Sequence, residues 1–178
     1  QTADATLTGN SNGECIRFVT CNNLTIKNCI VNVTSSSWGG IQVYGGTLTL
    51  QNNARVTVES NELALVGDKG ISITGSKVTA TANGAKTNAI YSESGSITIN
   101  HSTVEATGTS EGAFPAIYAA GDIMVENGSE VTATSSGMRG IFTNSDMTIN
   151  GSTVTAKGTT QEGMVVVGTL TVANSTLA

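Results

Sequence analysis

An apolar pattern that returns every two dozen residues is the feature that most constrains what this chain can fold into. The first residue of an apolar-x-apolar pair stands at Leu24, Leu48, Ile71, Ile97, Ile123, Met147 and Leu170, with spacings of 24, 23, 26, 26, 24 and 23 residues. Self-similarity at such a period is typical of a solenoid, because one repeat cannot bury its apolar face without its neighbours.

Each repeat contains three short runs in which apolar and polar residues alternate. We call them wall one (Ile41 type), wall two (Leu48 type) and wall three (Val56 type). The wall-one runs are Ile16/Phe18, Ile41/Val43, Leu63/Leu65, Ile90/Ser92, Ile117/Ala119, Ile141/Thr143 and Met164/Val166. A period of two indicates strands, and no helical stripe competes with it. We therefore predict an all-β, single-stranded right-handed parallel β-helix of about seven coils, as one domain over residues 1–178.

The corner between walls two and three has its own signature. Two residues before the first wall-three apolar position the chain always has a small residue, namely Cys29, Ala54, Ser76, Ser102, Ser129, Ser152 and Ser175. The residue before it is Asn or Gly in six repeats and His101 in the seventh. Small side chains suit a narrow interior corner, and Asn and Gly tolerate a left-handed backbone.

Units of the type Ile-Thr-Ile-Asn-Gly-Ser-Thr-Val-Thr-Ala (147–156, with Met at the first position) carry a family resemblance. The chain resembles the pectin-lyase-like right-handed β-helices, and most of all the Thr/Gly-rich repeats of secreted bacterial surface proteins, some of which are carbohydrate-binding domains. The resemblance implies an extracellular, cell-surface location and a chain that is part of a larger secreted protein. We also expect any signal peptide before Gln1 to have been removed.

Composition narrows the function classes. Charged residues are 12% of the chain and the net charge is −5, with no basic run, so nucleic acid is not an expected partner. No apolar stretch is long enough to span a membrane. The three cysteines (Cys15, Cys21, Cys29) form no metal-binding spacing, and a Cys15–Cys21 disulfide is left open. We expect no metal and no cofactor.

A candidate ligand site lies on wall one. Its outward positions are predicted to be Arg17, Gln42, Ala64, Tyr91, Tyr118, Phe142 and Val165, so three aromatic rings should stack on consecutive coils. The two longest wall-three to wall-one loops, 81–89 and 107–116, should form one protrusion beside them, carrying Phe114 and Glu111. Two interpretations stay open: a platform for a glycan or a protein, or aromatic pairing that only strengthens the sheet.

Catalysis has few candidates. Glu93, Glu111 and Arg139 are the charged groups expected near the strip, and the polysaccharide lyases and hydrolases of the resembled fold use clustered Asp, Arg and Lys. Asp122 and Asp146 precede wall-two strands one coil apart, which allows a shared cation or two turns capped separately.

We thus expect a non-catalytic binding or adhesion module, with a glycan or a host or cell-surface protein as partner. The alternatives are a structural stalk and, third, a polysaccharide lyase or hydrolase. Bare strand edges at the ends of a solenoid would allow end-to-end or side-by-side self-association.

Overall fold

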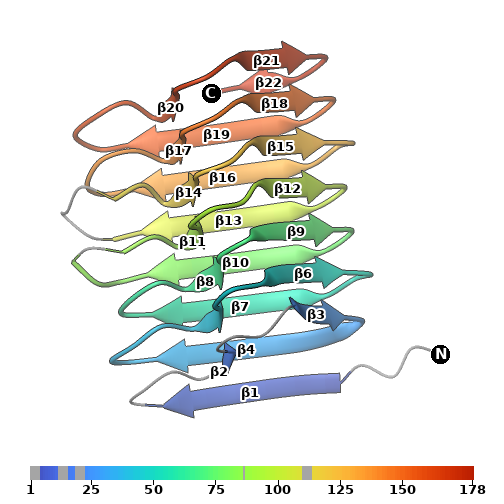
Figure 1. Cartoon of the computed structure of the whole chain (residues 1–178), viewed down its shortest axis with the longest axis vertical. Coiled ribbons are helices and arrows are strands. Elements are labelled where there is room, and N and C mark those ends of the chain that lie inside the picture. The colour runs from blue at the N-terminus through green and yellow to red at the C-terminus, as the bar shows by residue number, and fades with distance from the viewer. Residues whose placement is uncertain (1–4, 12–15, 19–22, 86, 110–113) are drawn as a thin grey trace.

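Three parallel sheets run the length of the molecule in the computed structural model (Figure 1), which describes residues 5–11, 16–18, 23–85, 87–109 and 114–178. The chain passes through the walls in the order three, one, two, and every strand pairs with its counterpart one coil away. The described residues are strands and connections, without a helix that could cross a membrane. The predicted β-solenoid is confirmed.

Wall one comprises β2 (Ile16–Phe18), β5 (Ile41–Val43), β8 (Leu65–Gly67), β11 (Ile90–Ser92), β14 (Ile117–Ala119), β17 (Ile141–Thr143) and β20 (Met164–Val166). Wall two comprises β3 (Asn23–Lys27), β6 (Thr47–Gln51), β9 (Gly70–Thr74), β12 (Ile97–Asn100), β15 (Ile123–Glu126), β18 (Met147–Asn150) and β21 (Leu170–Ala173). Wall three comprises β1 (Ala5–Ser11), β4 (Cys29–Ser35), β7 (Arg55–Ser60), β10 (Lys77–Ala82), β13 (Thr103–Gly108), β16 (Glu130–Ser135), β19 (Thr153–Gly158) and β22 (Thr176–Leu177).

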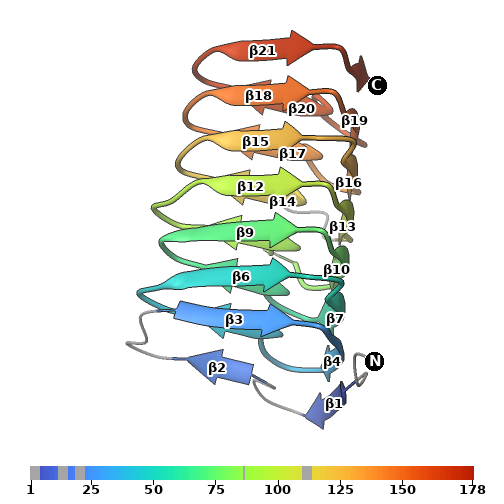
Figure 2. The same cartoon turned by 90° about the vertical axis from the view of Figure 1, so that its right-hand side faces the viewer.

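The register of wall two matches the sequence repeat at each coil. Leu48 pairs with Leu24 and Ile71, and the pairing continues through Ile97, Ile123, Met147 and Leu170. Figure 2 shows these strands stacked in front, with wall three along the right-hand edge. The apolar side chains of the middle coils are buried in one continuous core, which includes Leu48, Ile73, Ile97 and Ile123.

The serine corner holds neighbouring coils together through side chains as well as strands. The backbone N–H of Ser76 donates to the Ser102 hydroxyl at 3.2 Å, and Ser102 N–H donates to Ser129 in the same way. Ser129 and Ser152 continue the series, which ends on Ser175. Each hydroxyl in turn donates to a carbonyl of its own turn, for example Ser102 to Asn100 at 2.7 Å. The predicted vertical alignment of the small residues is confirmed.

The residues that precede the seven small corner positions all have a left-handed backbone, as predicted. The φ values are 51° at Asn28, 61° at Asn53, 55° at Gly75, 48° at His101, 74° at Gly128, 58° at Gly151 and 52° at Asn174. His101 is the one residue among the seven that is neither Asn nor Gly; like the three asparagines, it carries a Cβ in a conformation that most L residues rarely adopt. Cys29 occupies the small position of the first described corner as a half-buried free thiol; Cys15 and Cys21 lie outside the described residues.

One wall-one run was predicted in the wrong register. Leu65, not Leu63, pairs with Ile41 and Ile90. Val66 instead of Ala64 therefore lies between Gln42 and Tyr91 in the rank, that is, the row of residues at one position in successive coils. The sequence misleads here because Gly67 takes the place of the second inward apolar residue, opposite Val43, and the earlier pair Leu63/Leu65 fits the apolar pattern better than Leu65/Gly67. A Cβ at Gly67 would meet the Gly70 carbonyl oxygen at 2.3 Å, which explains the glycine.

Candidate binding site

Three aromatic rings lie on consecutive wall-one strands, as predicted. Tyr91 pairs with Tyr118, and Tyr118 pairs with Phe142, in the parallel register of β11, β14 and β17. The ring centroids of the two tyrosines are 5.2 Å apart with a 19° angle between planes, and those of Tyr118 and Phe142 are 5.8 Å apart at 3°. We call these three residues the aromatic strip. Their outward position follows from the alternation of the strand, since Ile90 and Ser92 on either side of Tyr91 are buried.

The rings of the strip stack on one another, and this limits what they offer to a ligand. Tyr118 stacks on a ring on each side, and the Arg139 guanidinium lies 5.4 Å from the centroid of Phe142. The Tyr118 hydroxyl accepts a hydrogen bond from the Asn144 side chain at 2.8 Å. Much of the stacking surface is therefore used inside the protein, and the pairing stabilises the sheet as one of the two predicted interpretations requires.

A groove nevertheless opens along the strip. Its volume is about 320 Å³, and its lining comprises the strip together with Asn88, Phe114, Pro115 and Arg139. Phe114 is 36% exposed, although it is a large apolar side chain. The strip and Phe114 thus line one depression, which combines aromatic surface with a few polar groups.

The two long connections beside the strip are attached to each other. The buried side-chain amide of Asn88, in the connection between β10 and β11, donates to the Pro115 carbonyl at 2.6 Å, in the connection between β13 and β14. The C-terminal ends of β10 and β13, from which the two connections start, lie next to each other on the left in Figure 1. This bond holds the described part of the second connection, and so Phe114, against the first.

A second depression, of about 470 Å³, adjoins the first and shares Asn88, Tyr91 and Phe114 with it. Glu62, Leu63 and Thr87 are among its other lining residues. Together the two depressions extend past β8, β11, β14 and β17, which are four successive strands. At about 4.8 Å per coil this amounts to roughly 14 Å along the solenoid axis. We call the combined feature the strip groove.

Burial is the main reason that the pKa of the Tyr91 phenol lies above its ordinary value, and the negative charges of Glu93 and Asp68 and the neighbouring Tyr118 phenol raise it further. The phenol is therefore kept neutral, as a hydrogen-bonding group in the wall of the groove.

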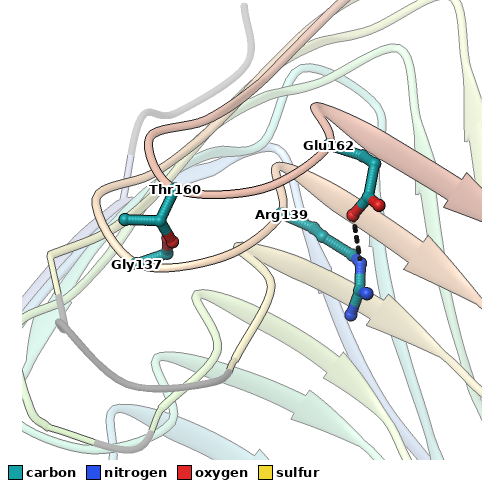
Figure 3. A network of polar contacts seen from close by, with 4 residues as sticks. All are labelled: Gly137, Arg139, Thr160 and Glu162. Carbon is teal, nitrogen blue, oxygen red and sulfur yellow. Dashed lines mark hydrogen bonds and ion pairs between the residues drawn. The ribbon is translucent and has the colours of Figure 1, made fainter.

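The charged candidates are separated by the strand between them. Arg139 precedes β17 and pairs with Glu162 of the next coil, its Nε lying 3.2 Å from the carboxylate (Figure 3). The backbone amide of Glu162 itself, and then the Arg139 side chain, hold the pKa of that carboxyl below its ordinary value. Glu93 is exposed and follows β11, at the opposite end of the wall-one strands, so the structure does not bring it to Arg139. Glu111 lies outside the described residues.

Asp122 and Asp146 accept hydrogen bonds from the next coil, not from their own turns. Asp122 accepts from the Ser145 hydroxyl and from the backbone N–H of Asp146 at 3.2 Å, while Asp146 accepts from Thr169 N–H at 2.7 Å. The prediction of separately capped turns was wrong in this respect, because in-register stacking brings each carboxylate under the amide above it. Within the part of the chain that the structure describes, no three His, Cys, Asp or Glu side chains gather to hold a metal ion.

Two features of the site were missed in the sequence. Gln42, on the outward rank of wall one, is only 2% exposed: its amide donates to the Leu63 carbonyl at 3.4 Å and its side-chain oxygen accepts from the Tyr44 hydroxyl. The second depression was the other omission, since Glu62 and Thr87 belong to loops of different repeats. Long-range loop contacts of this kind leave no periodic signal.

Comparison with known proteins identifies no relative of this chain. No protein-family model matches the chain, and neither the curated proteins nor the solved structures compared with it give a match.

Proposed function

We propose that this protein is a non-catalytic extracellular binding module, located at a bacterial cell surface, and that a glycan chain binds in the strip groove along the solenoid axis. The observation that carries the proposal is the exposed Phe114 ring, which lines the same groove as the aromatic strip, along a path that passes four coils. An exposed aromatic ring beside tyrosine hydroxyls and amides suits a ligand that has both apolar C–H faces and hydroxyl groups.

The chemistry of the lining favours a glycan over a charged polymer. Arg139 is already paired with Glu162, and Glu62 lines the second depression, so the groove has no surplus of positive charge. The resemblance to Thr/Gly-rich surface repeats and pectin-lyase-like solenoids agrees with this proposal, as does the length of the groove. The hydrogen bond from Asn88 to Pro115 would hold Phe114 in place before a ligand binds, which reduces the ordering cost of binding.

The test is the variant Phe114→Ala, because this side chain belongs to a loop and its loss leaves the strand ladders intact. Binding of the intact protein to a glycan array identifies ligands, and calorimetry with the best of them gives affinities. We expect Phe114→Ala to weaken binding by about tenfold. The matched control is Trp38→Ala, which removes a 53% exposed loop aromatic that does not line the groove.

Binding by Phe114→Ala that equals the wild type, or equal losses in both variants, would contradict the proposal. The double variant Tyr91→Ala/Tyr118→Ala tests the strip itself, with a thermal melt to separate lost binding from lost folding.

A structural stalk is the second candidate, and one observation favours it. The final described coil exposes Leu170 (42%), Val172 (43%) and Leu177 (42%), which correspond to buried positions in the coils below. A further coil or another copy stacked there would bury them. Analytical ultracentrifugation over a range of concentrations tests whether copies stack on this coil. A protein that stays monomeric at all concentrations would exclude a stalk built by self-association.

A further inference from the structure

A second groove follows the serine corner on the opposite edge of wall three from the long loops. Its main part has a volume of about 680 Å³ and includes Arg55, Lys77, His101 and Glu130 in its lining. A smaller depression, of about 290 Å³, continues it past Ser152 and Ser175. We call the main part the corner groove. It shares no lining residue with the strip groove.

Basic groups occupy three consecutive coils of this groove. Arg55 and Lys77 are direct partners in the register of β7 and β10, and His101 stands two residues before Thr103, the partner of Lys77 in β13. All three side chains are exposed. The chain has only eight lysines and arginines and a net charge of −5, so two cations at adjacent positions of one rank are a local reversal of its overall charge.

The arrangement of Arg55 and Lys77 opposes folding rather than assisting it. Like charges directly opposite one another on neighbouring strands repel. Among the residues that the structure describes, no carboxylate lies within ion-pair distance of either side chain. An anion between them would satisfy both charges at once.

The corner leaves space for such an anion. Gly75 and Gly128 line the groove, and a Cβ built on either of them would meet no atom within 4 Å, so their lack of side chains keeps the groove wide. Asn53 and Thr103 add neutral hydrogen-bonding groups at its edges. The serine hydroxyls, in contrast, are used by the ladder between coils.

We infer that the corner groove binds a tetrahedral oxyanion, a sulfate or phosphate group, between Arg55 and Lys77. The guanidinium can donate two parallel hydrogen bonds to such a group, while the ammonium contributes a point charge from the next coil. Glu130, two coils further along the same rank, repels negative charge. The site therefore accommodates a single anionic group or a short anionic segment, and not a long polyanion that follows the whole groove.

The experiment is an amide chemical-shift titration of the intact protein with sodium sulfate and with sodium phosphate, against sodium chloride at equal ionic strength. We expect saturable shifts at Asn53, Arg55, Lys77 and His101 that chloride does not produce. The variant Arg55→Gln/Lys77→Gln should weaken binding by at least about tenfold. The matched control Lys69→Gln/Lys157→Gln removes the same charge outside the groove and should bind as the wild type does.

A second arm distinguishes the sources of the anion. A singly sulfated oligosaccharide compared with its unsulfated form tests a sulfate ester on a glycan. Binding of the free ions alone assigns the site to a soluble anion, and either result supports an oxyanion site. Shifts reproduced by chloride, binding retained in Arg55→Gln/Lys77→Gln, or equal losses in both double variants would overturn it. Because the strip groove is separate, Phe114→Ala should leave this titration unchanged.

Discussion

The amide of Ser102 donates to the hydroxyl of Ser129, 27 residues later in the chain and one coil away, at 3.2 Å. Both residues are nearly completely buried, so water does not replace this bond if it is lost. At the corner between walls one and two, the donor and the acceptor change places: Asp122 accepts a hydrogen bond from the amide of Asp146, which lies in the coil that follows. The two side-chain ladders thus connect neighbouring coils in opposite senses.

Ser129→Ala removes the acceptor of a buried amide, and we expect it to lower the free energy of unfolding by about 1–3 kcal/mol. Urea denaturation measures the change. Thr132→Ala is the matched control, because Thr132 is exposed on β16, the strand that follows Ser129, and its loss should change stability by less than about 0.5 kcal/mol. Similar effects of the two substitutions would show that the serine ladder adds nothing to stability.

Ser92→Ala should have the opposite sign. The Ser92 hydroxyl is completely buried and, among the described residues, is the one buried side-chain polar atom without a hydrogen-bond partner. Replacing it with a methyl group removes an uncompensated desolvation cost, so we expect a gain of about 1 kcal/mol in the free energy of unfolding. A loss of similar size would reveal a partner for this hydroxyl.

His101 is the corner residue least suited to its backbone, with φ at 48°. His101→Gly should raise the thermal midpoint, by an amount equivalent to up to about 1 kcal/mol, because glycine adopts this conformation without steric cost. His101→Val should lower it, since a β-branched side chain is strained there. If valine were tolerated as well as histidine, the corner would have to relax out of the left-handed region.

The raised pKa of Tyr91 predicts a dependence of stability on alkaline pH. The neutral phenol is favoured in the folded state, so its contribution is complete below the unfolded value of 10.0 and is lost as pH rises through the higher folded value. Tyrosinate absorbance should show a component with a pKa above the ordinary tyrosine value, and this component should be absent in Tyr91→Phe. In this variant the alkaline fall of the thermal midpoint should be smaller. A component that titrates at the ordinary value would contradict the burial of this phenol.

Periodic features were predictable from the sequence, whereas features set by contacts between loops were not. The seven wall-two positions, the small corner residues and the stack of Tyr91 on Tyr118 all follow from residues repeating at one place in each coil. The register of Leu65 failed where a glycine interrupts the pattern. The Arg139–Glu162 pair and the Asn88–Pro115 bond depend on how loops of unequal length fold, and no repeat encodes that. The right-handed winding stays a prediction.

The constant register has a consequence for how such a molecule can change in size. Because Met147 occupies in its coil the place of Ile123, 24 residues earlier, excision of residues 123–146 would join Asp122 to Met147 with every inward position still filled. Phe142 would be lost with the excised coil, and Val165 would take its place next to Tyr118. Gain or loss of whole turns would thus shorten or extend a ligand surface in discrete steps, without any redesign of the interior.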